Sequence, residues 1–371
     1  MPAEAGPGAG VVEAAPPARP FHAGLQAVRG LAALLVFLQH TFAFANVAVE
    51  GPLDAVNRLN LGGVGIYLFF ALSAFLMLER SQDPPGRFIV DRLRRIYPTL
   101  WLSLLVVAPI TRYINGVYGV RWTTVLLVPT PVPAHVTVPF WSLSFEMALY
   151  LLVWLAMLVH ARLVAPVVLA WCAVGMVFHP LPYDPIGHAI FPETLPFFVT
   201  VFGYFFAAGI LARMVHRPRP WVVWPSLAAA VLLYLANQSG AFYGWLAVVL
   251  PAESLPRASF ATAALMTFCV IVGAASWTPR AWPARLLVRL GDVSYGVYLF
   301  HMGMMLPVAV LLKAIGLTSS YWVAAAIIAA VALPLSAAFG VLDLRLQVRL
   351  KAWTRGRSSA AIVRRAPRLA N

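Results

Sequence analysis

The chain has 371 residues, of which 61% are hydrophobic and only 11% are charged. Soluble domains carry about 25% charged residues because their surfaces face water, so this composition excludes an ordinary soluble fold and favours lipid as the solvent. The formal net charge of +14 would also suit a nucleic-acid-binding protein. Here the basic residues separate long apolar runs, which indicates a membrane protein with no nucleic acid partner.

Ten apolar segments are candidate transmembrane helices, since a helix needs about 20 such residues to cross a bilayer. Before them, residues 1–22 are rich in Ala, Pro and Gly and predict a disordered cytoplasmic tail. We expect an all-α bundle of about ten transmembrane helices in one membrane domain at 23–345, followed by a basic cytoplasmic tail at 346–371. The predicted spans are 25–45, 61–78, 97–111, 142–159, 163–178, 192–212, 221–236, 258–276, 291–312 and 321–342.

The basic residues predict the orientation of this bundle. The apolar stretch at 240–250 is too short to span and is expected to be re-entrant or interfacial, so it is not counted. With the N-terminus inside and ten alternating spans, 22 of the 27 Lys and Arg residues lie on the inner side and five on the outer side. Because Lys and Arg accumulate in cytoplasmic segments, both termini are expected in the cytoplasm of a multi-pass protein of the cell (inner) membrane.

The first predicted span carries two ionisable residues, Arg29 and His40. They are separated by about three helical turns, so they share one face and lie about 16 Å apart along the axis. Arg29 is expected at the inner edge of the membrane and His40 in its outer half. A snorkelling arginine and a buried, hydrogen-bonded histidine explain the pair without function, whereas ionisable groups in a span usually mark a functional site.

A basic segment follows the second predicted span and includes Arg92 and Arg95. These two arginines are about one helical turn apart, and guanidinium groups bind phosphate through paired hydrogen bonds. The segment is therefore either ordinary positive charge on the inner side or a clamp for a phosphate group.

Glu146 lies in the outer half of the fourth predicted span, on one face with Ser142 and Tyr150. A structural explanation is that the acid caps the helix or pairs with an arginine, and its place near the helix N-terminus favours the charged form. The functional explanation is a polar site inside the membrane.

The ninth predicted span places Ser294, Tyr298 and His301 on one face. Its direction predicts that His301 lies at the depth of His40. Two histidines and Glu146, from three helices, are therefore predicted to form one polar site in the outer half of the bilayer.

These residues fall into five motifs, in chain order, that resemble those of the membrane-bound acyltransferase-3 family, the ten-helix O-acyltransferases of bacterial polysaccharides and related acceptors. Each motif alone is weak, whereas five in order are specific. Ala74 departs from the family pattern, which usually has glycine there. The matching residues are Arg29, Gly30 and His40; 63–73; Arg92 and 95–98; 141–143 with Glu146; and Leu290, Gly291, Ser294, Tyr295, Tyr298, Leu299 and His301.

The resemblance implies transfer of an acyl group, usually acetyl, from acyl-coenzyme A to a hydroxyl group of a carbohydrate or glycoconjugate, with no metal and no bound cofactor. The implied partners are the acyl-coenzyme A donor, a carbohydrate or glycolipid acceptor and membrane lipid. An exopolysaccharide, a lipopolysaccharide O-antigen, a lipid-linked sugar and a small glycoside or antibiotic all fit as acceptor. The predicted site comprises catalytic His40, Glu146 and His301, donor-binding Arg29, Arg92 and Arg95, and substrate-binding Ser142, Ser294 and Tyr298.

His40 is predicted to act as general base on the acceptor hydroxyl or, alternatively, to form an acyl-histidine. Glu146 is predicted to orient an imidazole or to bind the acceptor. The phosphates of coenzyme A suit the inner arginines, and its pantetheine arm is expected to reach from Arg29 to His40. The alternative function is a proton-coupled transporter or permease, since His and Glu inside a membrane also form proton relays.

Overall fold

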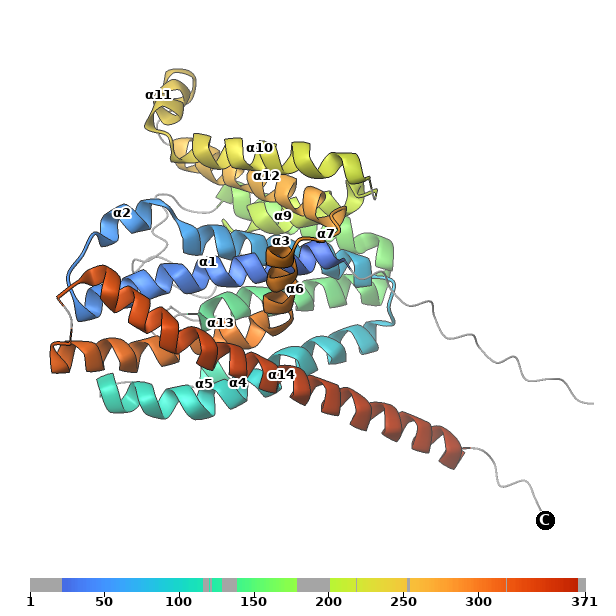
Figure 1. The fold of residues 1–371 in the computed structure, drawn as a ribbon. Coiled ribbons are helices and arrows are strands. Elements are labelled where there is room, and N and C mark those ends of the chain that lie inside the picture. The colour runs from blue at the N-terminus through green and yellow to red at the C-terminus, as the bar shows by residue number, and fades with distance from the viewer. Residues whose placement is uncertain are drawn as a thin grey trace, which may run out of the picture.

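The computed structural model describes residues 22–115, 120, 122–128, 139–178, 201–217, 219–251, 254–317 and 319–365, with side chains up to residue 352. All regular secondary structure in these ranges is helical (Figure 1). The helices are α1 (Ala23–Ala48), α2 (Leu53–Arg58), α3 (Leu61–Arg80), α4 (Pro85–Asn115), α5 (Trp122–Val125), α6 (Phe140–Val159), α7 (Val164–Phe178), α9 (Gly203–Val215), α10 (Val223–Gln238), α11 (Gly240–Val249), α12 (Leu255–Ala275), α13 (Trp282–Ile315) and α14 (Tyr321–Arg365), with short 3₁₀ helices η2 (Ala161–Leu163) and η3 (Pro220–Val222).

Nine helices of the described ranges are long and apolar enough to cross a membrane, which confirms the predicted all-α multi-span class. The remaining predicted span, 192–212, ends in α9, while its residues 192–200 lie outside the described residues. Of the predicted tail at 1–22, residues 1–21 also lie outside them. The short stretch at 240–250 forms the ten-residue helix α11.

α1 and α13 pack closely along each other because glycines lie at their contact. A β-carbon on Gly30 would lie 2.0 Å from the carbonyl oxygen of Leu287, and one on Gly291 would lie 2.1 Å from that of Gln26. No side chain fits at such distances, so glycine is what permits this approach of two backbones. α13 also packs on α14 and α4, and α1 on α3, so α1 and α13 occupy the centre of the bundle.

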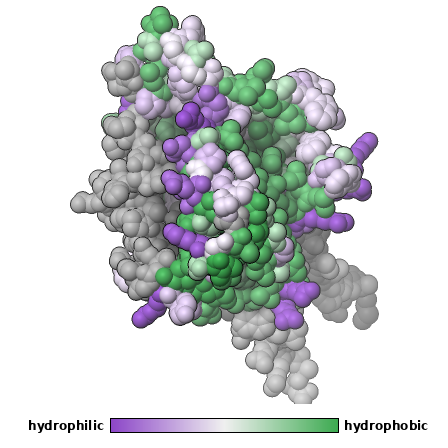
Figure 2. All heavy atoms as spheres, turned by 60° about the vertical axis from the view of Figure 1, so that its left-hand side comes forward, coloured by the Kyte–Doolittle hydropathy of each residue, from purple (hydrophilic) through white to green (hydrophobic). Residues whose placement is uncertain are grey.

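The helices α10, α11 and α12 lie at one edge of the bundle (Figure 1). α10 packs along α12, and α12 in turn packs on α9. Large apolar side chains of α10 are exposed, including Trp224 at 71% and Leu232 at 67%. Figure 2 shows that hydrophobic residues form a broad part of the molecular surface, as contact with lipid requires.

α14 is one helix from Tyr321 to Arg365. At 1.5 Å per residue it is about 67 Å long, roughly twice the thickness of a bilayer core of about 30 Å. Its C-terminal part extends away from the other helices (Figure 1). The predicted boundary between the membrane domain and the basic tail, at 345 and 346, therefore lies inside a continuous helix.

Candidate active site

His40 on α1 and His301 on α13 meet because the two helices run side by side in matched register. His40 follows Gly30 by ten positions, and His301 follows Gly291 by ten positions. Two parallel helices that touch at these glycines therefore bring the residues ten positions further along each helix to the same height. His40 Nδ1 lies 2.8 Å from His301 Nε2, and the two rings stack with centroids 5.0 Å apart.

The other ring nitrogen of His301 determines the direction of this hydrogen bond. His301 Nδ1 lies 2.8 Å from the carbonyl oxygen of Tyr298 and 3.1 Å from that of Val297. Carbonyl oxygens only accept, so Nδ1 of neutral His301 carries the proton and its Nε2 is an acceptor. His40 Nδ1 then donates to His301, and the Nε2 atom of neutral His40 keeps its lone pair. The histidine pair therefore presents one base, on His40.

Glu146, on α6, is held by two hydroxyl groups. Ser73 Oγ on α3 donates to Glu146 Oε1 at 2.8 Å, and the Tyr150 hydroxyl, one turn along α6, donates to the same oxygen. Among the described residues, the hydrogen bonds of Glu146 go to these two groups and to neither imidazole.

Ser142 and Tyr298 join the surroundings of Glu146 to the histidine pair. The Ser142 hydroxyl lies 2.6 Å from the Tyr298 hydroxyl, which also donates to the carbonyl oxygen of Pro139 at 3.1 Å. The Tyr298 ring lies 6.1 Å from the His301 ring, centroid to centroid. Tyr298 thus contacts α6 through its hydroxyl and the histidine pair through its ring and its backbone carbonyl.

A cavity of about 530 Å³ opens among α1, α3, α4, α6, α13 and α14. The three predicted donor-binding arginines line it together with Glu146. The predicted substrate-binding residues also line it; Ser294 donates its hydroxyl to the carbonyl oxygen of Gly291 at 2.8 Å. Within the described part of the chain, neither His40 nor His301 belongs to the cavity wall, so the histidine pair lies one side chain beyond it, behind Tyr298.

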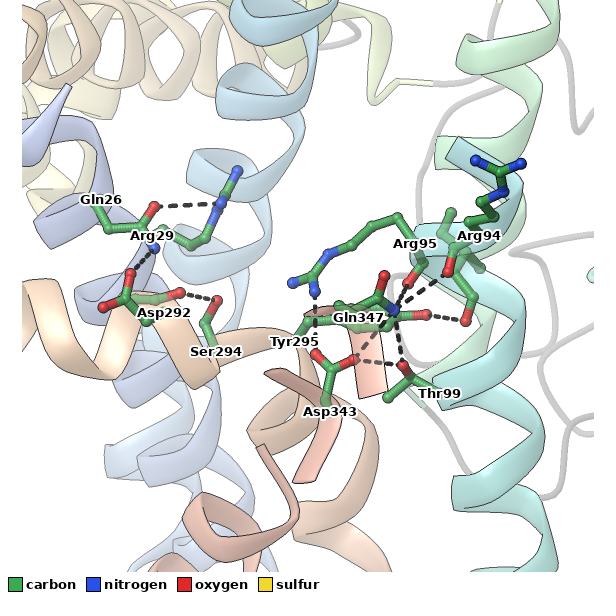
Figure 3. Close-up of polar contacts among 12 residues, drawn as sticks. Gln26, Arg29, Arg94, Arg95, Thr99, Asp292, Ser294, Tyr295, Asp343 and Gln347 are labelled. Atoms are coloured by element: carbon green, nitrogen blue, oxygen red, sulfur yellow. Dashed lines mark hydrogen bonds and ion pairs between the residues drawn. The ribbon is translucent and has the colours of Figure 1, made fainter. Parts of the chain in front are cut away.

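Arg29 is positioned by a chain of polar side chains from α1 and α13. Arg29 Nη1 donates to Gln26 Oε1 at 3.3 Å, and Gln26 Nε2 donates to Asp292 Oδ1 at 2.8 Å (Figure 3). Asp292 therefore holds the Gln26 side chain, which in turn holds Arg29. Arg29 and Asp292, the two ends of this series of hydrogen bonds, both line the cavity.

Arg95, on α4, donates through Nη1 to Asp343 Oδ2 on α14 at 3.1 Å (Figure 3). Its guanidinium carbon lies 4.9 Å from the centre of the Tyr295 ring. Arg92 lies over the Tyr150 ring at 5.7 Å, and its Nε atom is buried with no hydrogen-bond partner among the described residues. Arg92 therefore brings to the cavity wall a guanidinium group whose hydrogen-bonding capacity is not fully used among the described residues.

The structure thus divides the predicted site into two neighbouring groups. His40 and His301 form a pair, and Glu146 lies on the cavity wall with the arginines. Ser142 and Tyr298 connect the two groups. The chemical roles predicted for these residues stay predictions.

Several residues that the sequence did not single out complete the group around the arginines. Asp292 is next to Gly291 of the last motif, and Gln26 is one turn before Arg29, so proximity to motif residues was a usable signal. Asp343 carried only the weaker signal of an acid at the end of the last predicted span. The residues found from the structure alone are Gln26, Thr99, Asp292, Asp343 and Gln347.

The fold and these groups define a multi-pass membrane protein with a buried histidine pair next to an arginine-lined cavity. A family model described as an acyltransferase domain matches residues 22–341. The chain belongs to this family, the membrane-bound acyltransferase-3 family, and is an acyltransferase.

Two relatives illustrate the family. The chain is 27% identical over 312 residues to the acyltransferase MdmB of Streptomyces mycarofaciens, covering 75% of this chain and 77% of the relative. It is 28% identical over 265 residues to the exopolysaccharide production protein ExoZ of Rhizobium meliloti (strain 1021), covering 66% of this chain and 77% of the relative. No solved structure matches the chain.

Proposed function

We propose that this acyltransferase moves an acyl group, acetyl by family default, from acyl-coenzyme A to a hydroxyl group of a carbohydrate or glycolipid at the cell (inner) membrane. The observation that carries the proposal is the histidine pair beside a cavity lined by Arg29, Arg92 and Arg95. With most Lys and Arg residues on one side, both termini lie in the cytoplasm in this proposal.

The cavity supports coenzyme A as the carrier of the acyl group. Its volume of about 530 Å³ falls within the usual range of ligand sites, about 300–1,000 Å³. Arginines of α1 and α4 and Lys351 of α14 line it, and guanidinium groups suit the phosphates of coenzyme A. From Arg29 the axial distance to His40 is about 16 Å, which the extended pantetheine arm covers. Tyr298 and Ser142 stand between cavity and histidine pair, which fits their predicted contact with substrate.

The histidine pair supports general-base chemistry. His40 Nε2 accepts the proton of the acceptor hydroxyl, and the hydroxyl oxygen attacks the thioester carbonyl carbon. The carbon–sulfur bond then breaks, the coenzyme A thiolate leaves, and the proton on His40 passes to that thiolate. His301 keeps its acceptor nitrogen toward His40 Nδ1, so the imidazolium formed in the step stays hydrogen-bonded.

The same lone pair also fits an acyl-histidine route, in which His40 Nε2 takes the acyl group before the acceptor arrives. The two routes differ in whether the protein retains the acyl group when no acceptor is present. Radiolabelled acetyl-coenzyme A alone labels the protein in the acyl-histidine route and leaves it unlabelled in the general-base route.

The acceptor class is supported by one relative, whose name describes exopolysaccharide production. His40 is partly exposed although His301 is buried, so an acceptor has access to the base and not to its partner. We therefore place the acceptor hydroxyl against His40 Nε2, where the thioester end of the pantetheine arm arrives from the arginine-lined cavity.

A transfer assay on the full chain in lipid nanodiscs tests the proposal. Radiolabelled acetyl-coenzyme A is supplied with chemically deacetylated exopolysaccharide, and label in the polysaccharide and released thiol are both measured. We expect label transfer by the wild type and by Trp224→Ala, a control on the lipid-facing side of α10. No transfer and no thiol release would contradict the donor and leave the transporter alternative, whereas thiol release without label transfer would contradict the acceptor class.

A further inference from the structure

The side chain of Asp343 is a carboxylate that the bundle removes completely from water, with 0% exposure. Three donors converge on it: Thr99 Oγ1 at 2.5 Å, Arg95 Nη1 at 3.1 Å and Gln347 Nε2 at 3.3 Å. A buried carboxylate is retained only where such partners compensate for the loss of water. Two of the three donors come from α4, so Asp343 joins α14 to the helix that carries the predicted phosphate clamp.

Pro98 leaves a backbone carbonyl of α4 open to a donor from α14. Proline has no N–H, so the carbonyl oxygen of Arg94, four residues earlier in α4, lacks its usual helical donor. Gln347 Nε2, one turn after Asp343, lies 3.2 Å from that oxygen and 3.3 Å from the carbonyl oxygen of Arg95, so its two N–H groups are shared among these carbonyls and Asp343. The carbonyl oxygen that the proline leaves without a helical donor is thus reached by a side chain of α14, that of Gln347 (Figure 3).

Arg95 is held on two sides by this arrangement. One edge of its guanidinium group donates to Asp343, and its face lies on the Tyr295 ring. Its side chain is still 30% exposed, and it lines the cavity. An arginine has five N–H donors in a fixed plane, so the bond to Asp343 also fixes the orientation of the remaining N–H groups of this cavity-lining side chain.

We propose that Asp343, supported by Thr99 and Gln347, is a positioning residue for the acyl donor: it fixes Arg95 so that the free edge of the guanidinium group meets a phosphate of coenzyme A. α14 then contributes to the donor site in a second way, beyond the residues such as Lys351 that it places on the cavity wall. The inference rests on the proposed function, because Asp343 acts on the donor through Arg95 alone.

The test is a double-mutant cycle on coenzyme A binding, measured by calorimetry with the full chain in nanodiscs. Arg95→Ala is expected to weaken binding about tenfold, and Asp343→Asn about fivefold, since the amide keeps the size and loses the charge. The double variant is expected to bind within about twofold of Arg95→Ala, because Asp343 has nothing left to position. Wild-type affinity in Asp343→Asn, or effects that multiply in the double variant, would overturn the inference.

A second substitution keeps the test decisive if Asp343→Asn does not fold. Thr99→Val preserves the shape of the side chain and removes only the hydroxyl that donates to Asp343. We expect Thr99→Val to weaken coenzyme A binding about twofold to threefold in the wild-type background and to have no effect in the Arg95→Ala background. Equal effects in both backgrounds would overturn the inference. A wild type that binds no coenzyme A would instead refute the proposed donor, and the inference would fall with it.

Discussion

The histidine pair and the arginine-lined cavity lie side by side but are held in different ways. His301 is fixed by backbone carbonyls of its own helix, and His40 by His301. Arg29 and Arg95 are instead held by side chains, Gln26 and Asp343. The carbonyls of α13 and the fully buried Asp343 both hold their partners in place, but the carbonyls act on the histidine pair and Asp343 acts on an arginine of the cavity wall. The pair is therefore suited to the chemical step, and the cavity to binding an anionic ligand.

This comparison predicts that substitutions in the two regions separate turnover from donor affinity. The largest effect is expected for His40→Ala, which removes the base itself. General-base catalysis contributes about 10²–10⁴-fold, so we expect kcat to fall about 10³-fold while coenzyme A affinity stays within about twofold of wild type. Steady-state transfer kinetics in nanodiscs measure the fall. A well-folded His40→Ala variant with full turnover would remove His40 from the chemistry.

His301→Phe is expected to have the next largest effect. The phenyl ring fills the buried space of the imidazole but offers no acceptor to His40 Nδ1, so the orientation and tautomer of His40 are no longer fixed. We expect kcat to fall about 10²-fold, with KM for acetyl-coenzyme A within about twofold of wild type. Unchanged turnover would show that His40 does not depend on this hydrogen bond. Thermal unfolding in detergent controls for loss of the fold.

In the cavity, Arg92→Ala is expected to act on affinity. The substitution removes a charge-assisted contact worth about 1.5–3 kcal/mol, so KM for acetyl-coenzyme A should rise roughly tenfold or more, with a smaller change in kcat. Arg92→Lys is the matched control, because it keeps the charge and loses the planar donor set. Its KM for acetyl-coenzyme A should lie between those of the wild type and Arg92→Ala. A fall in kcat alone would contradict a donor role for this arginine.

The smallest effect is expected where the two regions meet. Tyr298→Phe keeps the ring beside His301 and removes the hydroxyl that contacts Ser142 and the carbonyl oxygen of Pro139. Loss of one such contact is worth about 1 kcal/mol, which predicts a change of about fivefold in kcat/KM. A loss of more than about 100-fold would place the hydroxyl in the chemical step itself.

The sequence predicted much of the histidine pair and less of the cavity. His40 and His301 were placed at one depth because the predicted spans had a direction, and the equal intervals from Gly30 and Gly291 are a second signal of the same register. Glu146 was predicted to share their site, yet its hydrogen bonds go to side chains of α3 and α6. Which helices are neighbours decides such contacts, and periodicity within one helix does not report it.

Asp343 shows the limit most clearly. It lies 248 residues from Arg95 in the chain and at the end of a predicted span that continues into basic residues. The sequence alone does not distinguish it from the other charged residues predicted on the inner side. Its complete burial and its contact with α4 arise only when α14 packs beside the carbonyl oxygen that Pro98 leaves without a helical donor. Long-range pairing of helices had to be seen in the structure.

Coenzyme A binding to two single variants tests the division between the regions most directly. Calorimetry on the full chain in nanodiscs compares wild type with His40→Ala and Arg92→Ala under one set of conditions. The account predicts that His40→Ala binds coenzyme A within about twofold of wild type, and that Arg92→Ala binds it about tenfold more weakly. Binding that is lost in His40→Ala and kept in Arg92→Ala would contradict it.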